Sequence, residues 1–486
     1  MNRMQIATET ERKYDVPDTF ELPSLLGTAG ISSVDGAETH DLDATYFDTD
    51  DLTLMRNRRT LRRRTGGTDA GWHLKTPGDG ISRTEHRLPL NGSPDEVPGE
   101  LVAQVRAITR RRPLRPVARL RTRRVETPLR DADGRVLALL AQDQVTAKAG
   151  GRKQSWQEVE VELVDGDTVL LDEVEGRLFA AGATAAAGPS KVARALGDRL
   201  NRTTKTNARK TNAAKKSKGN PVIRYATEQR DDLNAYDPGV RQGEPEAVHR
   251  MCVATRRLRS TLKTFKRTFP GSTPVADELK WLAGLLGEVR DGQVLEHKLL
   301  SGVEQAGAEF EPVAERIRAH LDAQVERGRA ALDEALESER YLALLDRIDR
   351  MVDDPDEPED DPLRRARNSL GKADDLLDVA LAGGEDVELH EARKAYKRAR
   401  YAVEVFGPTA GRPAKSLVKA LTDLQDVLGA HQDSVVAREL LYELGPDSFH
   451  FGVLWGRQEQ VGRDTYARLP VVVESSRKKN LRKWLG

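Results

Sequence analysis

The first 200 residues alternate polar and apolar side chains in short runs, which is the period of a β-strand. Residues 157–163 place three glutamates on one face and aliphatic side chains on the other. Residues 117–125 carry an arginine at alternate positions. Several such runs end at turn signals, for example Gly66-Gly67. Many short strands separated by turns predict an antiparallel sheet or barrel. Two helices are expected as well, at about 96–109 and 168–181.

The period changes to that of an α-helix from about residue 221. Residues 313–336, 338–349 and 363–382 are rich in Ala, Leu, Arg and Glu and contain few strand-forming residues. We therefore predict an α+β multidomain protein: an N-terminal antiparallel β-sheet or β-barrel, followed by an all-α domain built as a duplicated helical bundle. The expected domains are residues 1–200 and 221–486.

The helical half contains an internal repeat. Residues 249–265 align with 390–406, each beginning with His and carrying an Arg/Lys-Arg-x-Arg pattern about two to three helical turns later. Further on, Leu286-Gly287 aligns with Leu428-Gly429. The two matches are separated by 141 and 142 residues. This near-constant spacing predicts two related units, at about 221–352 and 363–486.

Two segments of unusual composition interrupt this pattern. Residues 201–220 contain seven Lys or Arg, no acidic residue and no large apolar residue, which predicts a basic flexible linker. Residues 353–362 are acidic and broken by proline, as in a solvated connection between helices. This acidic segment could also mimic a polyanion and occupy a basic site.

Composition narrows the class of protein. Lys+Arg and Asp+Glu both number 78 in the 486-residue chain, so the formal net charge is zero, which argues against a uniformly basic nucleic-acid binder. The single cysteine, Cys252, excludes an intrachain disulfide and a cysteine-rich metal site. No run of about 18 apolar residues occurs. We expect a soluble cytoplasmic protein that does not bind or span a membrane.

The strands of the first half present charged faces. Glu9, Glu11 and Lys13 would point to one side of the first strand, because side chains on a strand alternate. If the sheet stays open, these faces are simply solvated. If it closes with them inward, the lumen holds basic groups and carboxylates that must pair with one another or with a ligand. A polyanion with divalent cations would satisfy both kinds of group.

These residues resemble the CYTH superfamily, the triphosphate tunnel metalloenzymes. Besides Glu9-x-Glu11-x-Lys13, the matching elements occur in the family's order over about residues 4–200. They are Leu61-Arg62-Arg63-Arg64, Trp72-x-Leu74-Lys75, Arg83-x-Glu85, residues 116–124, residues 139–143, the strand carrying Glu158, Glu160 and Glu162, and Ser190-Lys191. The resemblance implies an eight-stranded tunnel that hydrolyses a triphosphate with Mg²⁺ or Mn²⁺. The substrate would be inorganic triphosphate or an organic one such as thiamine triphosphate.

The resemblance also implies roles for individual residues. The metal ligands would come from Glu9, Glu11, Glu160 and Glu162. The triphosphate would be bound by Arg62, Arg64, Lys75, Arg119, Arg121, Arg123 and Lys191. Lys13, Glu85 and Asp143 would act in catalysis, the two carboxylates by orienting a ligand or accepting a proton. Strand parity with Arg119 favours Arg121 and Arg123 over Arg124, and Glu160 with Glu162 are favoured over Glu158.

In the helical half, each repeat helix has a basic arc opposite an apolar one when placed on a wheel of 100° per residue. Two such helices facing each other would form a basic cleft that favours an anion. The repeats resemble the CHAD domain, the conserved histidine α-helical domain, which implies binding of inorganic polyphosphate. The matching residues are His249, Arg256, Arg257, Arg259, Lys263, His390, Arg393, Lys394, Lys397, Arg398 and Arg400. Cys252 stands where the second repeat has Arg393, so the halves are not equally basic.

The leading hypothesis is a metal-dependent triphosphatase whose helical domain binds polyphosphate. By this binding, the helical domain would deliver substrate or place the enzyme on polyphosphate granules. One alternative is a non-catalytic polyphosphate-binding or targeting protein. Another is an adenylyl cyclase of the same superfamily. Nucleic-acid binding through the basic helices is the least favoured. The sequence contains no Walker A, HExxH or nucleophile-elbow pattern, so other phosphohydrolase mechanisms lose support.

Overall fold

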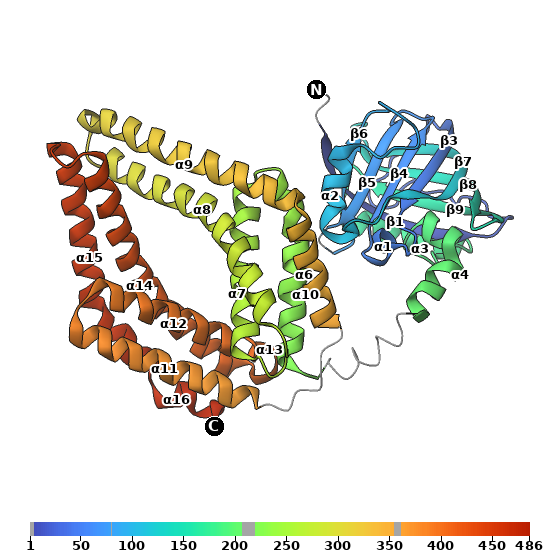
Figure 1. The fold of residues 1–486 in the computed structure, drawn as a ribbon. Helices are drawn as coiled ribbons and strands as arrows, with labels where there is room; N and C mark the ends of the chain where they lie inside the picture. The colour runs from blue at the N-terminus through green and yellow to red at the C-terminus, as the bar shows by residue number, and fades with distance from the viewer. Residues whose placement is uncertain (1–3, 79, 207–218, 354–360) are drawn as a thin grey trace. The chain divides into compact units, whose positions relative to one another are not determined.

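The computed structural model describes residues 4–78, 80–206, 219–353 and 361–486 (Figure 1). The chain divides into two compact units, Met1–Arg209 and Lys210–Gly486. Most of the predicted linker (207–218) and of the acidic segment (354–360) lies outside the described residues. Within the described residues, no helix is both long and apolar enough to span a membrane.

The first unit is a closed barrel, which confirms the predicted architecture. Its eight strands are hydrogen-bonded in the order β1-β6-β5-β4-β3-β7-β8-β9, every pair is antiparallel, and β9 pairs with β1 to close the ring. The strands are β1 Gln5–Val16, β3 Glu38–Asp48, β4 Thr60–Thr65, β5 Gly71–Pro77, β6 Ser82–Leu88, β7 Arg115–Arg130, β8 Val136–Ala149 and β9 Arg152–Leu163. Short strands β2 (Ser33–Val34) and β10 (Thr184–Ala185) pair with β7 and β1.

Two helices cover the outer face of the barrel. Helix α2 (Gly99–Thr109) packs its buried Leu101 and Val105 against Trp72 of β5. Helix α3 (Thr168–Ala180) begins at Asp167, whose carboxylate accepts hydrogen bonds from two backbone N–H groups, as expected of an N-cap. Its apolar stripe packs against Tyr14 and the valines of β9. Both helices lie where the sequence predicts them, and the short α1 (Thr53–Arg56) precedes β4.

A third helix enters the barrel itself. The buried side chains of Val192, Ala195 and Leu196 on α4 (Lys191–Thr206) pack against inward residues of β3, β7, β8 and β9, including Leu120 and Trp156. The apolar part of the lumen is therefore filled by α4, and the charged part remains open. Helix α4 also shows that the first residues of the predicted linker are helical.

The second unit is helical, as predicted. Its longer helices are α6 Pro221–Arg241, α7 Pro245–Thr264, α8 Thr273–Glu304, α9 Glu311–Glu337, α10 Glu339–Asp353, α11 Pro362–Gly383, α12 Asp386–Glu404, α14 Arg412–Leu444 and α15 Phe449–Ser476. Short elements are η1 Ala308–Phe310, α13 Gly407–Ala410, α16 Lys479–Arg482 and η2 Lys483–Leu485. Successive helices pack side by side as α6–α7, α8–α9, α11–α12 and α14–α15. Figure 1 shows these antiparallel pairs arranged as the sides of a frame.

The repeated sequence occupies equivalent places in this frame. In the first copy, the two matched stretches lie on α7 and α8. In the second copy, they lie on α12 and α14. These four helices lie on the inner side of the frame in Figure 1. The apolar arc of α7, including Met251, Leu258 and Leu262, is fully buried, so the opposite, basic arc remains available. Helices α7 and α12 also contact each other, which brings the two basic arcs together.

Candidate functional site

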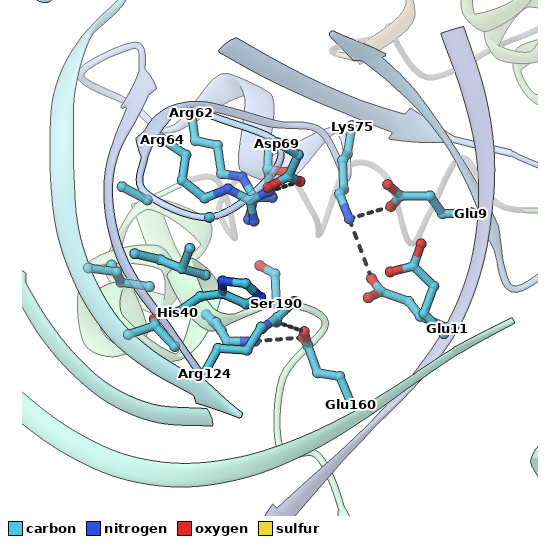
Figure 2. Close-up of a pocket in the computed structure, with 18 of the residues that line it drawn as sticks. Glu9, Glu11, His40, Arg62, Arg64, Asp69, Lys75, Arg124, Glu160 and Ser190 are labelled. Atoms are coloured by element: carbon cyan, nitrogen blue, oxygen red, sulfur yellow. Dashed lines mark hydrogen bonds and ion pairs between the residues drawn. The ribbon is translucent and has the colours of Figure 1, made fainter. Parts of the chain in front are cut away.

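The open part of the barrel lumen is a polar cavity of about 270 Å³ (Figure 2). Side chains from most of the strands and from the start of α4 line it. The ionisable ones are Glu9, Glu11, Lys13, His40, Arg62, Arg64, Asp69, Lys75, Arg83, Arg87, Arg124, Glu126, Glu160, Glu162 and Lys191. Acids and bases thus face each other in one enclosed space, where their interactions are stronger than in water.

The carboxylates of β1 pair with two lysines. Lys13 Nζ lies 3.0 Å from Glu11 Oε2 and also contacts Glu160. Lys75 Nζ contacts Glu9 and lies 3.9 Å from Glu11 Oε1 (Figure 2). Although burial opposes the charge of Glu11, these two lysines lower its pKa to about 2. Glu11 is therefore ionised at neutral pH.

A second cluster joins β7, β8, β9 and α4. Arg124 binds Asp143 through two hydrogen bonds of 2.9 and 2.8 Å and reaches Glu160 Oε2 at 2.5 Å. Lys191 Nζ lies 2.8 Å from Asp143, 2.6 Å from Glu158 and 2.6 Å from Glu160. Those three carboxylates offer oxygens within 4.8 Å of one another, a spacing that suits a metal ion. In this structure the Lys191 ammonium stands among them.

Two arginines of β4 form the opposite wall. The Nε–H groups of Arg62 and Arg64 are buried and have no hydrogen-bond partner among the described residues. Arg64 contacts Asp69, and Arg62 Nη1 lies 3.4 Å from the hydroxyl of Tyr46. Burial, with the nearby Arg62 and Arg124 charges, lowers the pKa of Arg64 to about 9. Cations crowded in this way favour an anionic ligand between them.

Glu162 stands apart from the other acids. In the β1–β9 ladder it lies directly opposite Glu11, and like charges in that relation are destabilising. Its carboxylate makes no hydrogen bond or ion pair with another described residue. Burial, followed by the neighbouring Glu9, Glu11 and Glu160, raises the pKa of Glu162 to about 7. A divalent cation between Glu11 and Glu162 would relieve this repulsion.

Glu85 of β6 is fully buried beside the lumen-lining Lys75 and Arg87. It contacts Arg87 and accepts from His73 Nδ1 at 3.1 Å, while Lys75 and Arg62 lie 3.9 Å away. Burial opposes its charge, but His73 and Lys75 hold the pKa of Glu85 far below its ordinary value. Glu85 and Asp143 thus remain ionised and orient lumen cations.

The structure corrects one part of the sequence-based site. Arg119, Arg121 and Arg123 lie on the outer face of β7, where Arg119 and Arg121 pair with Asp43. The side chains of Arg119 and Arg121 are 56% and 70% exposed, against 16% for Arg124. The inward row of β7 instead runs Leu120, Thr122, Arg124 and Glu126. Its first member is apolar because it packs against α4, so the outward arginine row looked like the charged lumen face.

The other predicted tunnel residues, including both suggested carboxylates, either line the lumen or contact groups that do. Sequence reasoning missed Arg87, which lies 2.9 Å from Glu9, and the lumen-facing Tyr46. The available signal was strand alternation. Arg87 lies two residues from Glu85 on β6, and Tyr46 lies two residues from Ala44 on β3, so each pair shares one face of its strand. Arg124 has the opposite strand parity to Arg119, so the parity rule does not select it.

In the helical unit, four cations from three helices come together. We call Arg256 of α7, Arg290 of α8 and Arg393 and Lys397 of α12 the basic cluster. Burial, together with the charges of Arg393, Arg256 and Arg290, lowers the pKa of Lys397 to about 8. Burial and Arg256 likewise lower the pKa of Arg393, although Asp433 opposes this. Mutual crowding of this kind makes the cluster a candidate polyanion site. Arg290 was not among the sequence-based candidates.

Two predicted polyphosphate residues have internal partners instead. Arg257 lies 3.1 Å from Glu404 Oε2 and over the ring of Tyr401, and Arg400 lies 2.6 Å from Glu404 Oε1. Tyr225 also donates to Glu404, at 2.7 Å. These contacts connect α6, α7 and α12. The main role of Arg257 and Arg400 in this structure is therefore to hold the helices together through Glu404.

The remaining predicted residues differ in their surroundings. Arg259 and Lys263 lie near Arg398, and burial followed by these like charges lowers the pKa of both. Lys394 is exposed and pairs with Glu391 on its own helix. His249 contacts Arg290, and His390 contacts Gln432.

Comparison with known proteins agrees with this division. A CYTH domain model matches residues 7–196, and a CHAD domain model matches residues 224–442. The uncharacterized proteins MT2285 and Rv2226 of two Mycobacterium tuberculosis strains are each 38% identical to this chain over 489 residues, covering 93% of it and 92% of their own length.

Two solved structures are also similar. PptA from Streptomyces chartreusis is 17% identical and covers 53% of this chain and 99% of its own, with a TM-score of 0.45. The CHAD domain from the plant Ricinus communis is 26% identical and covers 52% of this chain and 90% of its own, with a TM-score of 0.43. From the domain models and the full-length relatives, the chain belongs to the family of proteins that join an N-terminal CYTH domain to a C-terminal CHAD domain.

Proposed function

We propose that the barrel lumen hydrolyses a triphosphate-type substrate with a divalent cation, and that the helical unit binds inorganic polyphosphate. The observation that supports this most is the pairing of two unsatisfied groups in one lumen. The buried Nε–H groups of Arg62 and Arg64 have no acceptor among the described residues, and Glu162 lies opposite the like-charged Glu11 in the β1–β9 ladder. A phosphate chain carrying Mg²⁺ or Mn²⁺ would satisfy both.

The acidic side of the lumen suits the metal. Glu9, Glu11 and Glu162 provide hard carboxylate oxygens of the kind that Mg²⁺ and Mn²⁺ prefer, and Glu160 lies next to them. When bound, the cation would neutralise phosphate charge and lower the pKa of an attacking water. The second acidic group, Asp143, Glu158 and Glu160, is a weaker candidate because the Lys191 ammonium already stands among its three carboxylates.

The chain's own residues bind and orient the substrate. Arg62, Arg64 and Arg124 would donate to phosphate oxygens, and arginine suits this because its planar guanidinium donates in pairs. Asp143 fixes Arg124 through two parallel hydrogen bonds. Lys13 stands between Glu11 and Glu160, where it would contact a phosphate bound beside the metal. Positioning and charge stabilisation of this kind account for most catalysis of phosphoryl transfer.

The basic cluster of the helical unit would bind longer phosphate chains. Its four cations repel one another, so a polyanion gains the attraction and also relieves that repulsion. Two phosphate-binding units on one chain would let the helical unit deliver substrate or hold the enzyme at polyphosphate granules. If the two units act separately, substitutions in the basic cluster should weaken polyphosphate binding and leave the rate of triphosphate cleavage unchanged.

The test is a hydrolysis panel on the full chain with Mg²⁺ or Mn²⁺. Its substrates are inorganic triphosphate, thiamine triphosphate, ATP and long-chain polyphosphate, with products separated by chromatography. Release of phosphate from a triphosphate, lost in the Glu9→Ala, Glu11→Ala double variant, supports the proposal. Cyclic nucleotide from ATP would indicate a cyclase instead. Equal rates for wild type and double variant would refute the metal assignment.

A further inference from the structure

The two repeat histidines make equivalent contacts to the following inner helix. His249 Nδ1 on α7 accepts a hydrogen bond from Arg290 Nε on α8, at 3.0 Å. His390 Nδ1 on α12 lies 2.8 Å from Gln432 Oε1 on α14. Arg290 and Gln432 are 142 residues apart, so they occupy the same position in the two repeats. A histidine contact to this position is therefore part of the repeated unit.

The chemistry of the first contact fixes the state of the histidine. Arginine has donors only, so Nδ1 of His249 must carry a lone pair and the imidazole must be neutral. Burial, followed by the Arg290 charge, lowers the pKa of His249 and favours the same state. A neutral imidazole used as an acceptor adds no positive charge to the surface. His249 is thus unsuited to being an electrostatic contact for a polyanion.

The arginine that it holds belongs to the basic cluster. The charge of Arg290 reaches both Arg393 and Lys397 on α12. Besides donating Nε–H to His249, Arg290 lies 2.8 Å from Asp291 Oδ1 through Nη1. Two acceptors on different helices therefore fix the plane of the guanidinium. An arginine held in this way loses less side-chain entropy when it binds an anion.

We propose that His249 is a positioning residue that holds the Arg290 guanidinium in the basic cluster for polyphosphate, and that it does not itself contact the anion. This inference rests on the proposed polyphosphate binding by the helical unit. It assigns Arg290, on α8, to the anion surface that the repeat helices α7 and α12 define. The two repeats then differ in function at this position, because the second repeat has the neutral Gln432 where the first has the charged Arg290.

A double-mutant cycle on the full chain tests the proposal. Long-chain inorganic polyphosphate is titrated in the presence of EDTA, so that metal-dependent cleavage does not interfere, and any binding by the lumen is common to all variants. We expect His249→Ala and Arg290→Ala each to weaken binding about tenfold, as for loss of one charge-assisted contact. If His249 acts only through Arg290, the double variant is also about tenfold weaker.

Two further variants exclude a general structural effect. His249→Asn keeps an acceptor near the place of Nδ1 and should bind within about twofold of wild type. Arg250→Ala removes an exposed arginine next to His249 that pairs with Glu246, and it should also bind within about twofold. Circular dichroism melting curves check that every variant is folded. The slope of log affinity against log salt should fall by about one in Arg290→Ala and in His249→Ala alike.

The outcomes separate this inference from the function on which it rests. Wild type that fails to bind polyphosphate refutes the proposed function, and this inference with it. Wild type that binds, with a double variant about a hundredfold weaker, refutes only the positioning role, because additive losses mean independent contacts. A His249→Asn variant as weak as His249→Ala also refutes it.

Discussion

Replacing Lys397 with methionine should make the free protein more stable and its polyphosphate binding weaker. Lys397 is a partly buried ammonium that the structure surrounds with Arg393, Arg256 and Arg290. Burial and these charges lower its pKa from 10.5 to about 8, so keeping it protonated at pH 7 costs free energy in the folded state. Methionine keeps the apolar stem and removes the charge.

The magnitude follows from the pKa. A change from 10.5 to about 8 corresponds to about 3 kcal/mol, at 1.36 kcal/mol for each tenfold step in proton affinity. Because the methionine packs imperfectly, we expect a gain of about 1–3 kcal/mol at pH 7. The folded pKa lies below the unfolded one. The penalty in wild type is therefore complete below pH 8 and disappears as the pH rises from about 8 to about 10.5.

The assay is thermal unfolding followed by circular dichroism between pH 7 and pH 10.5, with and without polyphosphate. The midpoint of Lys397→Met should exceed that of wild type by about 2–4 °C per kcal/mol at pH 7, and the difference should shrink as the pH rises. Polyphosphate should stabilise wild type more than the variant, whose affinity falls about tenfold. A variant that is less stable than wild type at pH 7, or that binds polyphosphate equally well, would refute the reasoning.

Three further predictions concern the barrel. Mn²⁺ affinity should rise between pH 6 and pH 8 as Glu162 loses its proton, and Glu162→Gln should weaken binding at pH 8 and remove this pH dependence in calorimetric titration. Because the pKa of Glu162 is raised to about 7, its contribution to metal-free stability is present below about pH 4.5 and is lost as the pH rises through 7. Lys191→Ala should add a second Mn²⁺ site at Asp143, Glu158 and Glu160, seen as a stoichiometry of two instead of one. Leu196→Ala should lower stability by about 2–4 kcal/mol because it empties the α4 contact inside the barrel, measured by urea unfolding.

The fold was predictable because its patterns are long and repeated. Period-two alternation in the first half and the duplicated basic helices in the second indicate an antiparallel β domain and a helical bundle, and both are present. Closure of the barrel was predictable only through the resemblance, since alternation alone also fits an open sheet. The placement of α4 inside the lumen could not be read from sequence, because its apolar stripe suits any buried surface.

The site shows where strand parity fails. Glu9, Glu11 and Lys13 share the lumen face of β1, as alternation requires. On β7 the longest arginine row, Arg119 to Arg123, faces outward, because the lumen row is apolar where it meets α4 and charged only from Arg124 onward. The inner face of β7 is apolar at one end and charged at the other. A rule that takes the charged face of a strand to be the lumen face therefore gives the wrong answer for β7. Likewise, Arg290 lies on α8, beyond the His- and Arg-rich helix of its repeat, and joins the basic cluster only through the packing of α8 against α7.

Under the proposed function, the lumen, and not the outer face of the barrel, binds and cleaves the triphosphate. Arg124 and Arg123 are adjacent residues of the same type on opposite faces of β7, so they form a matched pair. The measurement is the rate of phosphate release from inorganic triphosphate with Mn²⁺ by wild type, Arg124→Ala and Arg123→Ala. The account predicts a loss of about a hundredfold or more for Arg124→Ala and a rate within about twofold of wild type for Arg123→Ala. Equal losses in both variants, or a larger loss in Arg123→Ala, would contradict it.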